Sequence, residues 1–246
     1  MKILKNITVF TMVMLLSVST VLEAREKNIS NFSSSASNLV DSTGTFDGNK
    51  IYADVANNGL FLDYHVSGDS ALEWPKGTGV HSIFQSALWM GATVNGSIRT
   101  IVGDYTQDMG PGPWGGDPLA AVHRIYKVEK SMLASPLDFA DFQEWPVEFG
   151  APWVDVDGDG VYTPLPGGTD HPEFLGDQVL WFVSNDGDPA YKLNFGTSPM
   201  NVEIQTTMFG FDRPDVFGDM VFLKQLVINK GSDDLVDTYM GLWSDP

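Results

Sequence analysis

The chain has 246 residues, of which 43% are hydrophobic and 12% aromatic, and this composition indicates a folded protein with a sizeable core rather than a disordered one. Its 14 basic and 32 acidic residues give a formal charge of −18, which argues against nucleic acid or an anionic membrane as a partner. Cysteine is absent, and this excludes disulfides, thiolate-bound structural zinc and a lipid-modified N-terminal cysteine.

The first segment has the pattern of a targeting signal. Lys2 and Lys5 precede an apolar stretch, Ile7–Leu22, and the small residue Ala24 stands before a charged run. This pattern predicts a signal peptide over residues 1–24, cleaved after Ala24, and therefore an extracellular or cell-surface location. An uncleaved membrane anchor is the alternative, but a stretch of 16 residues is short for a membrane span. We expect no integral membrane segment after removal of the signal.

The remainder divides by composition into two parts. Residues 25–48 are rich in Ser and Asn and predict a flexible linker. Residues 49–246 consist of short apolar runs separated by Gly, Pro, Asn and Asp, which predicts a mainly β domain, an antiparallel β-sandwich with one short helix and long loops. The excess of 24 Asp over 8 Glu supports this class, because Asp favours turns and Glu favours helices. The chain ends inside a strand pattern, so we expect it to be truncated at the C-terminus.

Eight runs are candidate strands. They are Gly59–Val66, Ser82–Thr93, Ile98–Tyr105, Val122–Glu129, Gln178–Ser184, Val202–Phe211, Met220–Asn229 and Val236–Trp243. Val202–Phe211 alternates apolar and polar residues, which predicts a half-buried strand. Met220–Ile228 is apolar at nearly every position, which predicts a strand in the middle of a sheet.

Between these strands the sequence predicts one loop and one helix. Asp108–Pro118 carries four glycines and three prolines, so we expect an irregular loop. Ser135 can cap a helix that has Pro136 at its first position, continues over Leu137–Trp145 and ends at Pro146.

The run 155–160 carries the clearest chemistry in the sequence. Asp155, Asp157 and Asp159 alternate and are followed by Gly160, the opening half of a calcium-binding loop. Calcium takes about 6–8 oxygen ligands, and alternate carboxylates in a tight turn can converge on one ion. Gly160 permits a bend through positive φ, and the carbonyl of Val161 falls where EF-hand-type loops supply a backbone ligand.

The second half of an EF-hand is missing. Pro166 stands at the twelfth position, where the full loop has a bidentate glutamate, and Thr163 stands at the ninth. We expect water or a later acid, Asp170 or Asp177, to complete the site, with Glu173 also near. The alternative is a solvated Asp/Gly turn without metal, although three unpaired acids repel one another. Magnesium fits less well, because it keeps more of its water.

Asn185–Asp188 is a second cluster of acids and glycine. Its composition favours a hairpin turn. The other interpretation is a further set of calcium ligands, or a partner that completes the first loop.

No spacing selects a catalytic residue, so an enzyme stays uncertain and less favoured. The acids that could include a glycosidase-type pair are Asp138, Asp141, Glu144, Glu148 and Glu173. Among the tryptophans, Trp74 and Trp114 lie in Pro/Gly loops and are weak candidates for stacking on a ligand. The others singled out, Trp89, Trp181 and Trp243, lie in strand patterns and are expected in the core. The histidines lack the spacing of a transition-metal site.

Several motifs together resemble large cell-surface proteins of Bacteroidetes-like bacteria, many of which carry a C-terminal sorting domain for type IX secretion. The motifs are Ser135-Pro136, Trp145-Pro146, Gly150–Gly160, Gly176–Gln178, Trp181–Val183, Asn185-Asp186, Gly77–Gly79, Leu88–Gly91, Val221–Leu223, Ile228–Gly231, Asp237–Tyr239 and Trp243–Pro246. The resemblance implies export, calcium binding and a multi-module, β-sandwich-rich architecture, and it supplies no catalytic residues. This chain shows no sorting domain, so its attachment to a cell surface stays open.

The sequence as a whole predicts a secreted or cell-surface, calcium-stabilised β-rich module for adhesion or for contact with a glycan or protein, without enzymatic activity. The alternatives are a secreted carbohydrate-active enzyme of glycoside hydrolase type and a structural spacer in a larger surface protein.

Overall fold

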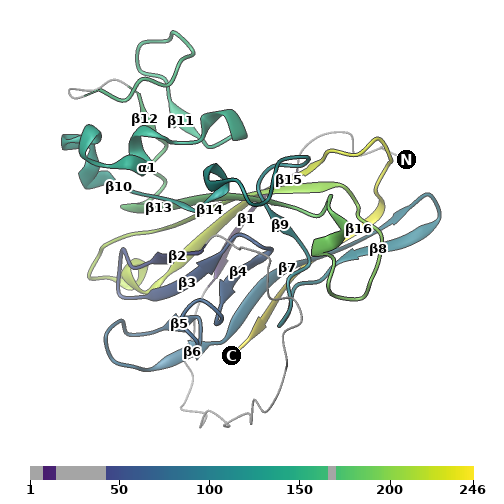
Figure 1. Cartoon of the computed structure of the whole chain (residues 1–246). Coiled ribbons are helices and arrows are strands. Elements are labelled where there is room, and N and C mark those ends of the chain that lie inside the picture. Colours follow the sequence, from purple (N-terminus) through teal and green to yellow (C-terminus); the bar gives the residue numbers. More distant parts are fainter. Residues whose placement is uncertain (1–7, 15–42, 166–169) are drawn as a thin grey trace.

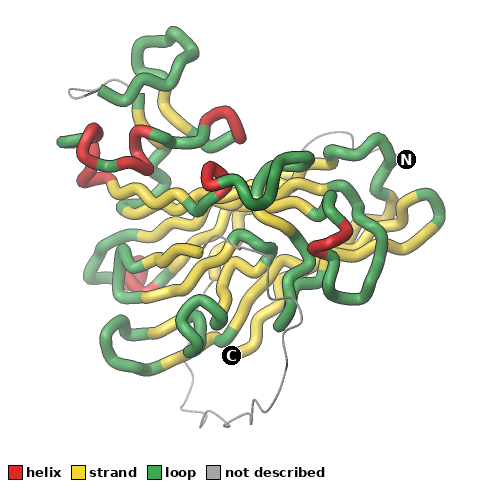
Figure 2. Tube along the Cα trace, viewed as in Figure 1, coloured by secondary structure: helices red, strands yellow, loops and turns green. Residues whose placement is uncertain are grey.

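The computed structural model describes residues 8–14, 43–165 and 170–246 (Figure 1). The fold is mainly β and built from antiparallel sheets in a sandwich-like arrangement, as predicted (Figure 2). In these residues there is one α-helix, α1 (Ala140–Gln143). The short 3-10 helices are η1 (Ala121–His123), η2 (Lys130–Ala134), η3 (Pro136–Asp138), η4 (Val147–Phe149), η5 (Pro189–Tyr191) and η6 (Val216–Asp219).

One sheet is central to the fold. Its strands, in spatial order, are β1 (Thr8–Met14), β15 (Val221–Asn229), β14 (Val202–Gly210), β13 (Gln178–Asn185) and β10 (Tyr126–Glu129), with β9 (Gly110–Pro111) paired to the end of β13. β15 lies between β1 and β14, and this position confirms the prediction that the apolar run Met220–Ile228 forms a strand in the middle of a sheet.

Two further sheets face the central one, and a small hairpin stands apart. The second sheet has the order β16 (Val236–Asp245), β7 (Gln85–Val94), β4 (Leu60–Asp63), with β8 (Ser97–Ile101) also paired to β7. The third has the order β2 (Thr43–Phe46), β3 (Tyr52–Ala56), β5 (Leu72–Glu73), β6 (His81–Ile83). The hairpin pairs β11 (Trp153–Val154) with β12 (His171–Pro172).

The core lies between these layers. Leu180 and Met208 of the central sheet share a buried cluster with Phe46 and Ile51 of the third-sheet region. Val202 and other residues of the central sheet pack in the same way against β7 and β8. Figure 1 shows β13 and β14 extending across both smaller sheets. Burial of these apolar side chains is the main favourable term in the stability of the sandwich.

The opposite face of the central sheet is also covered. Phe142 and Trp145, from the segment that follows β10, pack on Trp181 and its neighbours. As a result β13 and β14 are buried at every position, so the prediction of a half-buried strand over Val202–Phe211 was wrong. Of its polar residues, Glu203 accepts from the backbone nitrogen of Trp114 and Gln205 donates to the carbonyl of Phe149, so these two are paired within the protein instead of solvated.

The predicted helix over 136–145 is shorter and irregular. Pro136–Asp138 forms η3, and α1 begins only at Ala140, because Phe139 between them has extended backbone angles of φ −124° and ψ 115°. Trp145 follows the helix and is buried. The helix therefore presents Phe142 to the core over a single turn.

The N-terminal boundaries differ from the sequence-based ones. Thr43–Phe46, in the predicted linker 25–48, forms β2, and the side chain of Phe46 is fully buried. Thr8–Met14, inside the predicted signal peptide, forms β1 and pairs with β15. The expected cleavage site after Ala24 and the rest of the linker lie outside the described residues. Within those residues, no helix has both the length and the apolar character to cross a membrane.

Candidate functional site: an aspartate loop

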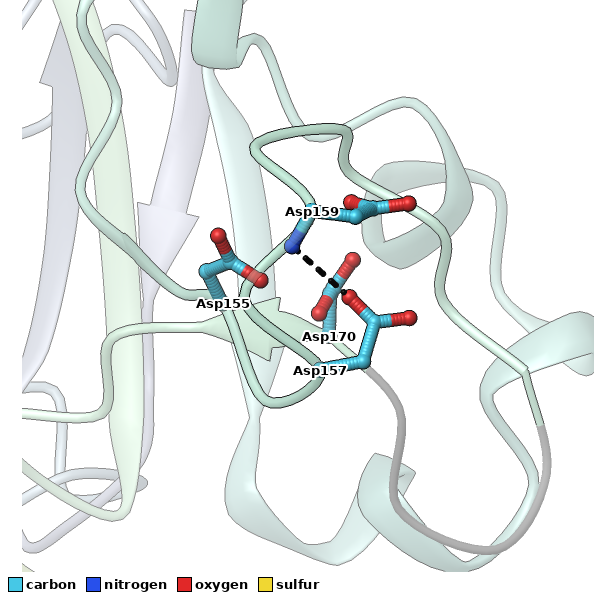
Figure 3. A group of neighbouring side chains, drawn as sticks. All are labelled: Asp155, Asp157, Asp159 and Asp170. Carbon is cyan, nitrogen blue, oxygen red and sulfur yellow. Dashed lines mark hydrogen bonds between the residues drawn. The ribbon is translucent and has the colours of Figure 1, made fainter.

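The β11–β12 hairpin brings the predicted metal-binding acids together. Asp155 directly follows β11 and Asp170 directly precedes β12, and the pairing of Val154 with His171 places these two acids side by side. One carboxylate oxygen from each of Asp155, Asp157, Asp159 and Asp170 lies within 4.8 Å of the others. Figure 3 shows the four side chains gathered around the loop. Asp170, one of the two acids expected to complete the site, is therefore a member of the group.

Backbone hydrogen bonds shape the first half of the loop. Asp155 accepts from the backbone nitrogen of Gly158 with Oδ1 (2.7 Å) and from that of Gly160 with Oδ2 (2.9 Å). Gly158 and Gly160 have φ angles of 78° and 76°, a conformation that glycine adopts without the clash of a side chain. Asp157 and Asp159 each accept from the nitrogen two residues later, at 3.2 Å and 2.7 Å. These hydrogen bonds fix the orientation of the three exposed carboxylates in the turn.

Asp170 closes the loop from the other strand. Its side chain is buried, whereas the other three acids are exposed. Oδ1 accepts from the backbone nitrogen of Val156 at 2.9 Å, and Oδ2 accepts from that of Thr163 at 2.7 Å. One carboxylate therefore ties the beginning and the end of the turn to β12.

The negative charges of the aspartate loop repel one another. A hydrogen bond from the backbone of Asp159 favours the ionised form of Asp157, but partial loss of water and the negative charges of Asp159, Asp170 and Asp155 outweigh it and raise the pKa of Asp157. A bound cation would relieve this repulsion. Because the candidate ligands are all carboxylate oxygens, the group suits a hard cation.

The loop is connected to the helix before it. The hydroxyl of Tyr162 donates to the carbonyl of Phe142 in α1 at 2.6 Å, and the ring of Tyr162 meets Trp153 of β11 edge to face, with 5.6 Å between centroids. Burial, with a smaller contribution from Asp170, raises the pKa of Tyr162. The conformation of the loop thus bears on how α1 meets the hairpin.

Two predicted members of the site have other positions or roles. Asp177 is not in the group of four; its Oδ2 accepts from the backbone nitrogen of Asp212 at 2.9 Å, beside the start of β13. Asp177 was a wrong candidate, because the pairing of β11 with β12 places Asp170, and not Asp177, beside Asp155. The nitrogen of Val161 donates to Asp159, and a ligand role for the Val161 carbonyl stays a prediction.

Asn185–Asp188 does not join the aspartate loop. Asp186 is buried and accepts from the backbone nitrogens of Met200 and Val202, both at 2.7 Å. The ammonium of Lys192, also buried, lies 3.0 Å from Asp108 and 3.8 Å from Asp186. This buried ion cluster joins the connection between β8 and β9 to the connection between β13 and β14. Sequence reasoning missed it, since the isolated Lys192 has no local signal that pairs it with an acid 84 residues earlier.

Three of the acids considered for catalysis form ion pairs with basic side chains. Arg124 contacts Asp141 at 3.0 Å and Glu144 at 2.8 Å. Glu173 lies 4.0 Å from Lys224. Three of the five acids are therefore paired with a basic residue in the described part of the chain.

The burial of the tryptophan side chains differs in part from the prediction. Trp74 is half-buried against the core, and its indole nitrogen donates to Asp219 at 3.0 Å, so its role as a ligand site stays a prediction. Trp114 is 44% exposed and lines a hollow at the end of β13. Trp181 is buried as expected, but Trp89 and Trp243 are half-buried and stack on each other, with 5.8 Å between ring centroids.

Comparison with known proteins gives no relative. No protein-family model matches the chain, and neither the curated proteins nor the solved structures contain a significant match.

Proposed function

We propose that the chain is an exported or cell-surface, calcium-stabilised β-rich module that makes contacts with a glycan or a surface protein and has no catalytic task. The observation that carries the proposal is the convergence of Asp155, Asp157, Asp159 and Asp170, each with an oxygen within 4.8 Å of the others. The apolar stretch after Lys2 and Lys5 supports export.

Calcium would act by holding two parts of the fold together. Its ligands come from both sides of the β11–β12 hairpin, and Tyr162 links the same loop to Phe142 of α1. A cation that binds the folded chain and not the unfolded one stabilises the fold by mass action, by about 2.7 kcal/mol at a hundredfold excess over Kd. Water and the carbonyl of Val161 are the expected remaining ligands.

Thermal unfolding in calcium and in chelator tests this proposal. For a chain of this size, the expected gain in Tm is roughly 5–10 °C at a hundredfold excess of calcium over Kd. Asp155→Asn should lose most of the gain. Asp69→Asn, at an exposed acid outside the group, is the matched control and should keep it. Equal Tm values with calcium and with chelator would contradict the proposal, as would equal losses in the two variants.

A binding module fits the hollow beside Trp114 better than a hydrolase does. A glycosidase requires two carboxylates that face each other across the sugar. Among the described residues lining the hollow beside Trp114, Asp188 is the single carboxylate. The proposal for this surface is therefore contact and not bond cleavage.

A further inference from the structure

We propose that the hollow beside Trp114 binds one ring of an uncharged sugar, with the face of the sugar stacked on the indole. The proposal rests on the contact function proposed above and names its site. The hollow lies where β9 pairs with the end of β13, has a volume of about 320 Å³, and is lined by Gly110, Trp114, Asn185, Gly187, Asp188 and Tyr191 among others. That volume is at the small end for ligand sites and suits a single ring.

The indole of Trp114 is exposed and yet held in place. Its backbone nitrogen donates to the buried carboxylate of Glu203 at 2.9 Å, and its indole nitrogen lies 3.3 Å from Oδ1 of Asn201. Its ring rests on Gly187, where an added Cβ would lie 2.6 Å from the indole Cδ1. An exposed aromatic ring fixed by these contacts offers a ligand a flat apolar surface with little further loss of entropy on binding.

The glycine-rich loop that carries Trp114 is held to β13 by hydrogen bonds. The side-chain nitrogen of Asn185 donates to the carbonyls of Gly112 and Pro113, at 2.9 Å and 3.3 Å, and the nitrogen of Gly112 donates to the carbonyl of Val183 at 2.9 Å. Gly112 lies directly against His123, with no room for a Cβ. The glycine-rich loop is therefore preformed rather than shaped by a ligand, as a binding site requires.

Tyr191, which also lines the hollow, is likewise packed against a glycine. The ring of Tyr191 is buried against Gly110, where an added Cβ would approach within 3.0 Å of it. The two glycines thus seat the two aromatic rings that border the space. A side chain at Gly187 would clash with the indole of Trp114, and one at Gly110 would crowd the ring of Tyr191.

The polar groups and charge select the ligand class. Oδ1 of the exposed Asp188 accepts from the nitrogen of Ala190 at 2.8 Å, and its Oδ2, which has no hydrogen-bond partner in the described chain, is available to a ligand hydroxyl. A carboxylate is a strong acceptor for such a donor. Asp188 and the overall charge of −18 disfavour an anionic ligand. A sugar ring has both an apolar C–H face for the indole and hydroxyls for the acid.

Titration of the full chain by isothermal titration calorimetry, in calcium, tests the site with defined probes. The probes are the methyl glycosides of glucose, galactose, mannose and N-acetylglucosamine, with glucuronate as the anionic comparison. Binding of at least one neutral probe is expected, with glucuronate weaker. Trp114→Ala should raise Kd about tenfold or more, and Trp114→Phe, which keeps an aromatic face, should raise it less.

Tyr239→Ala is the control, because Tyr239 is 77% exposed on β16, away from the hollow. It should leave Kd unchanged. No binding of any neutral probe, tighter binding of glucuronate, or equal effects of Trp114→Ala and Tyr239→Ala would overturn the inference. Calcium-dependent stabilisation is measured separately, so a failure of sugar binding with an intact gain in Tm would overturn this site alone.

Discussion

Asp170 accepts a hydrogen bond from the backbone nitrogen of Val156 at 2.9 Å, and this contact fixes the aspartate loop to the opposite strand of its hairpin. Asp170 is buried, whereas the acids of the turn are exposed. Two roles can therefore be separated by experiment: the hydrogen bonds to the backbone, which need no metal, and the proposed role of Asp170 as a calcium ligand.

Asp170→Asn should destabilise the fold both with and without calcium. In the variant, an amide nitrogen replaces one of two accepting oxygens, so either Val156 or Thr163 loses its acceptor. Loss of a hydrogen bond to a buried group costs about 1–3 kcal/mol. Urea unfolding in chelator measures this loss, and the same experiment in calcium should show a smaller calcium gain than in the parent. Unchanged stability in chelator would show that the backbone role is wrong.

Asp157→Asn should have effects of opposite sign in the two conditions. The pKa of Asp157 is raised in the folded state, so ionisation costs the folded state stability above that raised pKa, and the cost disappears as the pH falls through it toward the ordinary value. Removing the charge in chelator at neutral pH should leave Tm unchanged or raise it. In calcium the variant should show a smaller gain, since a charged ligand is lost. A drop in Tm in chelator would contradict the repulsion argument.

The grouping of the acids in the aspartate loop was largely predictable from the sequence, because three of the four are neighbours in the chain. Asp155, Asp157 and Asp159 lie within one turn, so their spacing alone brings them together. Asp170 required the β11–β12 pairing, which the sequence did not predict because each strand has only two residues. Asp177, seven residues further along the chain, instead accepts a hydrogen bond from the backbone nitrogen of Asp212.

The positions of the strands were predicted better than the burial of their side chains. Apolar runs identified β13, β14 and β15 to within a few residues, because long strands of a central sheet are rich in apolar and β-branched residues. The complete burial of β14 was not predictable from its alternation. It depends on residues 132–162 and 174–175, which fold over the sheet, and on partners for polar residues such as Glu203, which accepts from the backbone nitrogen of Trp114.

Lys192→Met should be among the most destabilising substitutions. It leaves Asp108 and Asp186 buried without their cation, and removal of one partner of a buried ion pair costs about 3–5 kcal/mol. Burial and the charge of Asp108 already raise the pKa of Asp186, despite the opposing hydrogen bonds and Lys192. The ionised Asp186 therefore costs stability at neutral pH, and the variant should recover part of its loss as the pH falls toward the raised pKa.

Lys50→Met is the control for this substitution. Lys50 pairs with Asp219 at 2.9 Å, but both side chains are partly exposed, and such surface pairs contribute about 0–1 kcal/mol. Urea unfolding of the two variants at pH 7 and pH 5 compares them. Similar losses in both, or a Lys192→Met loss that grows at pH 5, would contradict the assignment of a buried ion cluster.

His65→Ala should move acid unfolding to higher pH. Burial tends to raise the pKa of Asp63, but hydrogen bonds from the His65 ring and backbone and from Gln85 outweigh it and lower the pKa. The ionised Asp63 therefore stabilises the fold above the ordinary Asp pKa of about 3.9, and this contribution is lost as the pH falls through the lowered pKa. Removing the ring deletes the 2.7 Å contact to Oδ1 and leaves the backbone donor in place, so part of the lowering persists. Circular dichroism from pH 6 to pH 2 in chelator gives the midpoint, with His81→Ala at an exposed histidine as the control. A shared midpoint for the parent and both variants would show that the Asp63–His65 contact does not hold the fold at low pH.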